Sequence, residues 1–131
     1  MKLRVRHNSI RFRLGQSEVE ALWKSGACRE EIVFPGGARL EYALLASGNG
    51  SVGASFADGV VAVSIPKDQL SVWHSTDQIG IRASVDVSGK VPGDENLLVL
   101  IEKDFRCIDD RVDEDQSDSF DNPAGVHQRC G

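Results

Sequence analysis

The chain has 131 residues, of which 40% are hydrophobic, and a formal net charge of −5, which predicts one domain with a sizeable core and disfavours a general nucleic-acid binder. The opening residues lack the apolar centre of a signal peptide and no apolar run is long enough to span a bilayer, so we expect a soluble, cytoplasmic protein without a membrane partner. Three widely spaced cysteines, Cys28, Cys107 and Cys130, argue against a disulfide framework and fit a reducing compartment.

The charge is divided unevenly along the chain. From Asp104 to Gly131 there are eight acidic residues against three arginines, which accounts for the whole net charge. The preceding body is neutral and could still carry a local basic face. We predict a single duplicated domain over residues 1–107 and an acidic C-terminal tail over residues 108–131.

The chain begins with a pattern that is typical of a hairpin. Apolar and basic residues alternate over residues 2–6 and again over residues 9–14, on either side of the turn His7-Asn8. Because successive side chains of a strand point to opposite faces, this pattern predicts a hairpin with one apolar and one basic face.

An amphipathic segment follows the hairpin. Ser17-x-x-Glu20 has the form of a capping box, and Gly26 is a typical helix stop, so a short helix is expected over residues 16–25. Its apolar positions are Val19, Leu22 and Trp23.

The second half of the chain repeats this order of elements. Asp58-Gly59 is the strongest two-residue hairpin signal in the sequence, and a short helix that carries Leu70 and Trp73 follows it. The remaining strands are expected over residues 28–34, 39–46, 52–56, 60–65, 79–87 and 96–105.

The strand over residues 96–105 differs from the others because its apolar residues do not alternate. This pattern predicts a strand that is covered on both faces, around which the rest of the chain packs. We therefore expect Leu98, Leu100 and Phe105, or their immediate neighbours, to be almost fully buried.

A shift of 51 residues superimposes the two halves. It aligns Leu3 with Ala54, Val5 with Phe56, Ile10 with Val61, Phe12 with Val63, Leu14 with Ile65, Val19 with Leu70, Leu22 with Trp73 and Cys28 with Ile79. Alternating strands can also superimpose by chance, but we favour an internal duplication with repeat units 1–46 and 52–105. The expected fold class is α+β, mostly β, with two ββαββ units related by a pseudo-twofold axis in a small barrel-like domain.

Two stretches of the chain resemble known families. Residues 60–67, the short helix after them and residues 77–81 are similar to the swapped-hairpin barrel of the AbrB-type transcriptional regulators. In that family the unit pairs as a dimer, whereas here the resemblance implies that both copies lie in one chain.

A broader resemblance spans almost the whole chain. The opening M-K-L-R-V-R, the later I-E-K-D-F-R-C at 101–107 and E-D-Q-S-D-S-F at 114–120 are similar to motifs of a family of small uncharacterised bacterial proteins. This resemblance implies a soluble bacterial protein and transfers no activity. The family pattern ends in F-P-N-P, where this chain has F-D-N-P at 120–123.

The basic side of the first hairpin is a candidate binding surface. Two adjacent strands hold such side chains close enough to contact several phosphates at once. The alternative is a solvated face whose charges are balanced by nearby carboxylates. The residues concerned are Lys2, Arg4, Arg6, Arg11 and Arg13.

A second candidate lies where the apolar strand ends. Glu102, Lys103, Asp104 and Cys107 occupy a position at which sheet proteins often place ligand-binding or catalytic groups. The alternative is a strand end that turns polar as it reaches solvent, with Cys107 as a small buried hydrophobe.

Metal-binding patterns are incomplete. Asp113-x-Asp115-x-Ser117 opens like a calcium loop, but Asp118 and Ala124 stand where glycine and a bidentate glutamate are required. Cys107, His127 and Cys130 form a poor zinc motif. We therefore name no metal, cofactor or catalytic residue.

These observations favour a non-enzymatic binding or interaction module with a polyanion or a protein as partner at the basic hairpin, and a role in regulation linked to an anion or a nucleic acid is left open. The alternative is a small enzyme or a divalent-metal-dependent protein with a site between residues 102–107 and the acidic tail. We also expect residues 108–120 to dock on the body through Phe120 and the basic hairpin. A homodimer is left open.

Overall fold

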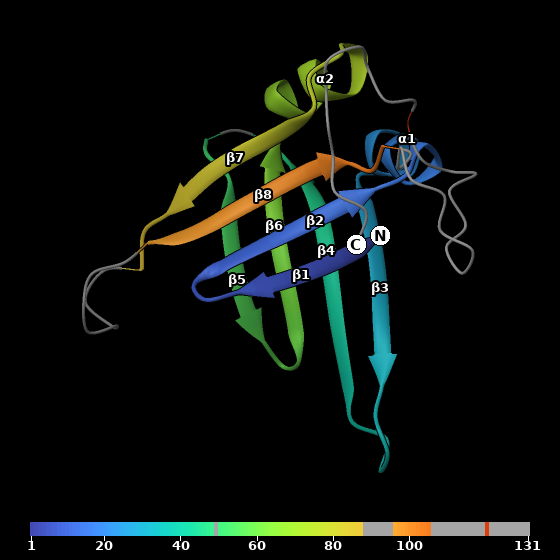
Figure 1. Ribbon diagram of the computed structural model, residues 1–131, viewed down its shortest axis with the longest axis vertical. Coiled ribbons are helices and arrows are strands. Elements are labelled where there is room, and N and C mark those ends of the chain that lie inside the picture. The colour runs from blue at the N-terminus through green and yellow to red at the C-terminus, as the bar shows by residue number, and fades with distance from the viewer. Residues whose placement is uncertain (49, 88–95, 106–119, 121–131) are drawn as a thin grey trace.

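Eight strands form two separate four-stranded sheets in the computed structural model, which describes residues 1–48, 50–87, 96–105 and 120 (Figure 1). The elements in chain order are β1 (Lys2–Arg6), β2 (Ser9–Leu14), α1 (Gln16–Ser25), β3 (Ala27–Val33), β4 (Arg39–Ser47), β5 (Gly53–Ala57), β6 (Val60–Pro66), α2 (Lys67–Ser75), β7 (Gly80–Val85) and β8 (Leu97–Lys103). The expected order of strands and helices is confirmed, with most boundaries within one or two residues.

Each sheet combines a hairpin from one half of the chain with a hairpin from the other. Sheet A has the order β1-β2-β8-β7, and sheet B has the order β3-β4-β6-β5. The central pairs, β2 with β8 and β4 with β6, are parallel, and every other pair is antiparallel. The fold class α+β, mostly β, is confirmed, but the sheets do not close into a barrel, because among the described strands each sheet ends at two free edges.

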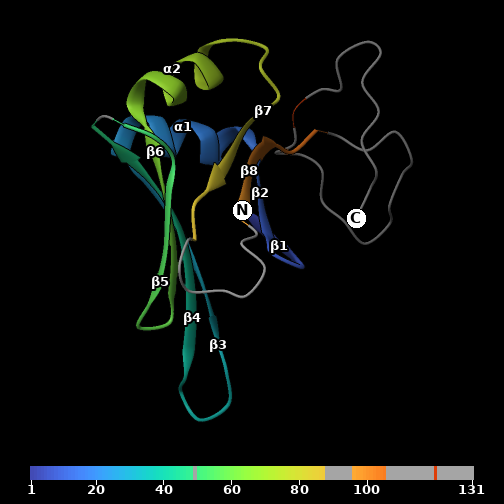
Figure 2. The same ribbon diagram turned by 90° about the vertical axis from the view of Figure 1, so that its left-hand side faces the viewer.

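Figure 2 shows the two sheets side by side, with α1 and α2 together above them. The fully buried side chains come from both sheets and both helices, so one core lies between the layers. The largest of them are Trp73, Phe12, Leu14, Leu22, Leu44, Ile65, Leu70, Ile101, Val63 and Val99. Trp73 also donates its indole N–H to the carbonyl of Ile79 at 3.0 Å, which satisfies the one polar atom of this ring.

Leu22 and Trp73 occupy corresponding places in α1 and α2, and both are fully buried. The shift of 51 residues aligns Phe12 with Val63, and these two residues hold matching places in the central pairs, because Phe12 pairs with Ile101 and Val63 pairs with Leu44. The partners Leu44 and Ile101 are separated by a larger shift of 57 residues. That this correspondence arose by duplication stays a prediction.

The expected match of Cys28 with Ile79 is wrong. Leu44 and Ile101 hold corresponding places in the two sheets. Because Cys28 pairs with Leu44 and Ile81 pairs with Ile101, the counterpart of Cys28 is Ile81. The reason is a longer connection between helix and strand in the second half, which offsets the alignment by two residues at β7.

The N-terminus of α1 is capped differently from the expected capping box. The helix begins at Gln16, so Ser17 lies inside it, and the backbone N–H of Gly15 donates to the Glu18 carboxylate at 2.9 Å. The helix ends, as expected, at Gly26, whose φ of 82° lies in the left-handed region that glycine adopts without strain.

The two helices contact each other on the surface as well as in the core. Trp23, which the sequence pattern assigns to the apolar stripe, is 40% exposed, and its ring stacks on that of His74 with centroids 5.1 Å apart. His74 Nε2 in turn lies 2.6 Å from Glu20 Oε1. Glu20 therefore bridges α1 to α2 instead of capping α1.

The expectation that β8 is covered on both faces is wrong. Val99 and Ile101 are fully buried and Phe105 nearly so, whereas Leu98 and Leu100 are only partly buried. The strand is central in sheet A, between β2 and β7, but sheet B and the helices cover one face alone. No described element covers the other face, which we call the outer face of sheet A.

Phe120 docks beside the end of β8. Its N–H donates to the carbonyl of Asp104 at 2.6 Å, and its ring lies 5.8 Å from that of Phe105. The part of the docking expectation that concerns Phe120 is thus confirmed, whereas residues 106–119 and 121–131, including the calcium-like and zinc-like motifs, lie outside the described residues.

Neither described helix is long and apolar enough to cross a membrane.

Candidate functional site

The outer face of sheet A carries the basic residues of the first hairpin. The register of β1 and β2 places Lys2 directly opposite Arg13 and Arg4 directly opposite Arg11. Like charges directly opposite each other on neighbouring strands repel and destabilise a sheet. We call this surface the basic face, and it consists of Lys2, Arg4, Arg6, Arg11 and Arg13.

Strand β8 brings two carboxylates to the basic face. Glu102 Oε1 lies 3.2 Å from Nε of Arg11 and 3.8 Å from Nε of Arg13. Asp104 Oδ2 lies 3.2 Å from Nζ of Lys2. The expected Glu102 and Asp104 therefore do join the basic residues, and they balance part of their charge. Because β8 follows β2 by more than 80 residues, only the parallel pairing of these strands creates this contact.

The carboxylates leave part of the basic face without a counter-charge. Within the described residues, no ion pair or hydrogen bond engages the side chains of Arg4 and Arg6. Nε of Arg13 is buried and has no hydrogen-bond partner, because Glu102 is too far away to accept from it. A pocket of about 200 Å³ lies here, lined by Lys2, Leu3, Arg4, Arg11 and Arg13.

A second pocket, of about 500 Å³, lies at the other end of the same sheet, and Arg6 contributes to it. Two of its asparagine side chains already make hydrogen bonds within the lining, since Asn8 donates to the backbone carbonyl of Asn96 at 3.1 Å and Asn96 donates to Ser84 Oγ at 3.0 Å. The sequence pattern did not point to Ser84 on β7 or to Asn96 just before β8, because both lie far from the first hairpin in the chain. The lining residues are Arg6, His7, Asn8, Ser9, Ser84, Asn96 and Leu98.

Lys103 does not lie on the basic face, in contrast to Glu102 and Asp104, its neighbours at the end of β8. Its side chain points to the opposite side of β8 from its neighbours Glu102 and Asp104, and the residue is 5% exposed. Nζ donates to the carbonyl of Thr76 at 2.7 Å and lies 5.4 Å from the centre of the Phe120 ring. Burial lowers the pKa of this amine. Lys103 therefore satisfies a carbonyl at the end of α2.

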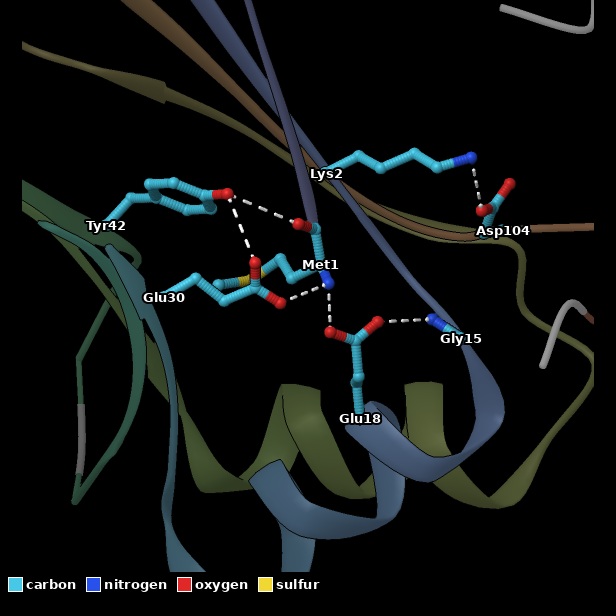
Figure 3. A network of polar contacts seen from close by, with 7 residues as sticks. All are labelled: Met1, Lys2, Gly15, Glu18, Glu30, Tyr42 and Asp104. Atoms are coloured by element: carbon cyan, nitrogen blue, oxygen red, sulfur yellow. Dashed lines mark hydrogen bonds and ion pairs between the residues drawn. The ribbon is translucent and has the colours of Figure 1, made fainter. Parts of the chain in front are cut away.

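The α-amino group of Met1 is held by a network at the edge of the basic face (Figure 3). It donates to Glu18 and, at 2.7 Å, to Glu30, while the hydroxyl of Tyr42 donates to Glu30 at 3.3 Å. Burial acts to lower the pKa of the amine, but the hydrogen bonds to the two carboxylates outweigh it, so its pKa is raised above 8.0. The sequence pattern did not reveal this network, because its residues come from three separate elements.

The pKa of Glu30 moves in the opposite direction. Burial acts to raise it, but the hydrogen bond and the charge of the Met1 amine outweigh burial and hold the pKa below 4.5. The network anchors the start of β1 to α1 and β3. It therefore fixes the position of the next residue, Lys2, whose side chain reaches the carboxylate of Asp104 in Figure 3.

Among the described residues, no cluster of three or more His, Cys, Asp or Glu side chains is arranged to hold a metal ion. The carboxylates of Glu102 and Asp104 are engaged by cations. The outer face of sheet A thus presents the basic residues next to the partly buried side chains of Leu98 and Leu100.

Residues 1–124 match a family of unknown function, DUF7009. No curated protein and no solved structure gave a significant match, so the resemblance to AbrB-type regulators stays a prediction. The match agrees with the broader resemblance at the level of an uncharacterised family. Because it covers most of the sequence, the chain belongs to the family of unknown function DUF7009.

Proposed function

We propose that the protein is a non-enzymatic binding module that binds linear polyanions on the basic face. The observation that supports this most directly is the pairing of Arg4 with Arg11 beside a pocket, with Arg4 lacking an ion pair in the described structure. A sheet that sets cations opposite each other forgoes stability, and an anion bound between them removes the repulsion. Phosphate or sulfate groups spaced along a chain match such a row of cations.

The chemistry of this face favours contacts to a charged backbone over contacts to bases. The large exposed aromatic residues of the described structure lie elsewhere, with Trp23 on α1, Phe34 after β3 and Phe56 on β5. Without an aromatic platform, nucleic-acid bases cannot stack on the basic face. We therefore expect binding with little sequence preference and with a strong dependence on salt.

The acidic tail is expected to compete with an external polyanion. Phe105 and Phe120 pack together at the end of β8, beside the ion pair of Lys2 with Asp104. The connecting sequence contains six acidic residues, which are Asp109, Asp110, Asp113, Glu114, Asp115 and Asp118. Tethering at both ends raises their local concentration near the basic face, and this makes weak ion pairs effective.

Fluorescence anisotropy with a labelled DNA duplex and with labelled heparin, over a series of salt concentrations, tests the proposal. The double variant Arg4→Gln/Arg11→Gln should bind more weakly and with a salt slope lower by about two, because each lost phosphate contact removes about 0.9 from the slope. The matched control is Arg29→Gln/Arg39→Gln, which removes the same charge from sheet B and should retain the wild-type slope.

Equal loss in the two double variants would show that net charge alone drives binding and would contradict a site on the basic face. Absence of wild-type binding to both polyanions at about 50 mM salt, where such contacts are strong, would refute the proposal as a whole. A rise in Tm with Mg²⁺, Ca²⁺ or Zn²⁺ and none with heparin would instead favour the metal-dependent alternative.

A further inference from the structure

Strand β5 differs from the other three edge strands of the described sheets. The edge strands β1, β3 and β7 each contain at least one Lys, Arg or Glu. Charged side chains on an edge hinder the addition of another strand. Strand β5, with the sequence GASFA, contains no charged residue and no proline. It is therefore the one described edge without this protection.

The comparison of β5 with β1 is especially direct, because the two strands hold corresponding positions in the two halves. Both form hairpins through two-residue turns and both lie at the outside of a sheet. Val5 and Phe56 correspond, and they are 67% and 71% exposed. The neighbouring position is Arg4 in β1 and Ser55 in β5. The edge strand thus carries cations in the first half of the chain and no charge in the second half.

The backbone of β5 has groups available for pairing. The turn Asp58-Gly59 is closed by the pair Ala57 and Val60, and hydrogen-bonded pairs then alternate along the hairpin. By this alternation Ala54 and Phe56 direct their N–H and C=O groups away from β6. No described residue accepts from or donates to these groups.

We propose that β5 pairs antiparallel with β5 of a second copy of this chain, around a twofold axis at Ser55. In this register Ala54 of each copy faces Phe56 of the other, and both pairs use the outward backbone groups. The two sheets B then form one continuous eight-stranded sheet. Each exposed Phe56 ring packs on the side of the partner that carries Ala54, which removes apolar surface from water.

Charge is the reason to favour a second copy as the occupant of this edge. In a symmetric antiparallel pair every residue near the axis faces itself or a close neighbour, so a charged strand repels its copy. Two β1 strands paired in this way would place Arg4 opposite Arg4, whereas two β5 strands place Ser55 opposite Ser55. The neutral strand is self-complementary, and the basic face on sheet A stays accessible in both copies.

The contact is small, because it consists of one short strand and one aromatic ring from each copy. Interfaces below roughly 1,200 Å² are typically weak, so we expect a dimer that dissociates in the micromolar range of about 1–100 μM. Sedimentation velocity and light scattering of the full chain over about 1 μM to 0.5 mM should therefore show a concentration-dependent shift from monomer to dimer.

Two variants of β5 should shift this equilibrium to the monomer. Phe56→Pro removes the outward N–H and the ring but breaks no hydrogen bond to β6. Ser55→Lys sets two ammonium groups opposite each other at the axis, and it should weaken the dimer by at least tenfold at low salt and by less at high salt. The matched control is Val5→Pro, which makes the same change at the corresponding position of β1 and should leave the dimer intact.

Circular dichroism and thermal melting establish that each variant is folded before its mass is measured. If Phe56→Pro does not fold, Ser55→Lys decides alone, because Ser55 is exposed and its side chain supports no core contact. The proposal is overturned by a wild-type chain that stays monomeric up to about 0.5 mM. It is equally overturned by a dimer that neither β5 variant weakens, or that Val5→Pro weakens as much.

Discussion

Glu102 lies across from Arg13 in the register of β2 and β8, yet its carboxylate approaches Arg11 more closely, at 3.2 Å against 3.8 Å. The carboxylate of Glu102 thus forms ion pairs with two guanidinium groups. This arrangement determines how much positive charge the basic face can offer to a ligand, and it leads to the first prediction.

Glu102→Gln should strengthen the binding of DNA and heparin. The change frees Arg11 and Arg13 to contact anions and removes a negative charge from the face, so we expect an affinity gain of about 3-fold to 10-fold at low salt that declines as salt is added. Anisotropy titrations measure it. Glu41→Gln, which removes a carboxylate that pairs with Arg29 on sheet B, is the control and should change the affinity little. An equal gain in both variants would contradict a local effect.

The two faces of β8 should differ in their tolerance to substitution. Ile101→Ala should lower the free energy of unfolding by about 2–5 kcal/mol, because Ile101 is fully buried and its truncation leaves a cavity. Leu100→Ala should lower it by about 1 kcal/mol, because Leu100 on the outer face keeps part of its contact with water. Urea denaturation of both variants checks this. A larger loss for Leu100→Ala would mean that an additional element covers the outer face.

The network around the Met1 amine predicts a stability plateau in pH. The pKa of the amine is raised above 8.0 in the folded chain, so its contribution is complete below pH 8 and is lost as pH rises through the folded value. The pKa of Glu30 is held below 4.5, so its contribution is present above pH 4.5 and is lost as pH falls through the folded value.

Thermal melting from about pH 3 to pH 10 should therefore show that Glu30→Gln lowers Tm most on the plateau and flattens the decline on both sides. Glu31→Gln is the control, because Glu31 belongs to the same strand but pairs with Arg39 on the exposed surface. If the two variants give parallel curves, the network does not set the pH dependence. An extension fused ahead of Met1 should have the same effect as Glu30→Gln, since it replaces the ammonium by an amide.

Phe120→Ala should both destabilise the protein and expose the basic face. Phe120 packs on Phe105 and lies over Nζ of Lys103, so its loss should lower the free energy of unfolding by about 1–3 kcal/mol. If the acidic tail competes with polyanions, the same variant should bind heparin more tightly. Phe34→Ala, at a residue that is 48% exposed, is the control. If Phe120→Ala destabilises the protein but leaves heparin binding unchanged, Phe120 docks on the body but the acidic tail does not compete with heparin.

The sequence by itself determined the local elements of this protein. Alternation of apolar and polar residues identified the strands, and the turn signals were sound, because His7 and Asp58 adopt positive φ values of 49° and 52° in tight hairpins. The first helix has the bounds that its periodicity and Gly26 predict. These features depend on neighbours in the chain, whose side-chain spacing and backbone preferences the sequence states directly.

The tertiary structure decided which hairpins share a sheet, and with that the composition of the candidate site. The contact of Arg11 with Glu102 exists because β2 pairs with β8, two strands far apart in the chain. Strand alternation then sends Lys103 to the core side and leaves Leu100 on the uncovered side. An apolar run has no period that shows which face is covered, so only the packing of sheet B and the helices against one side of sheet A could settle it.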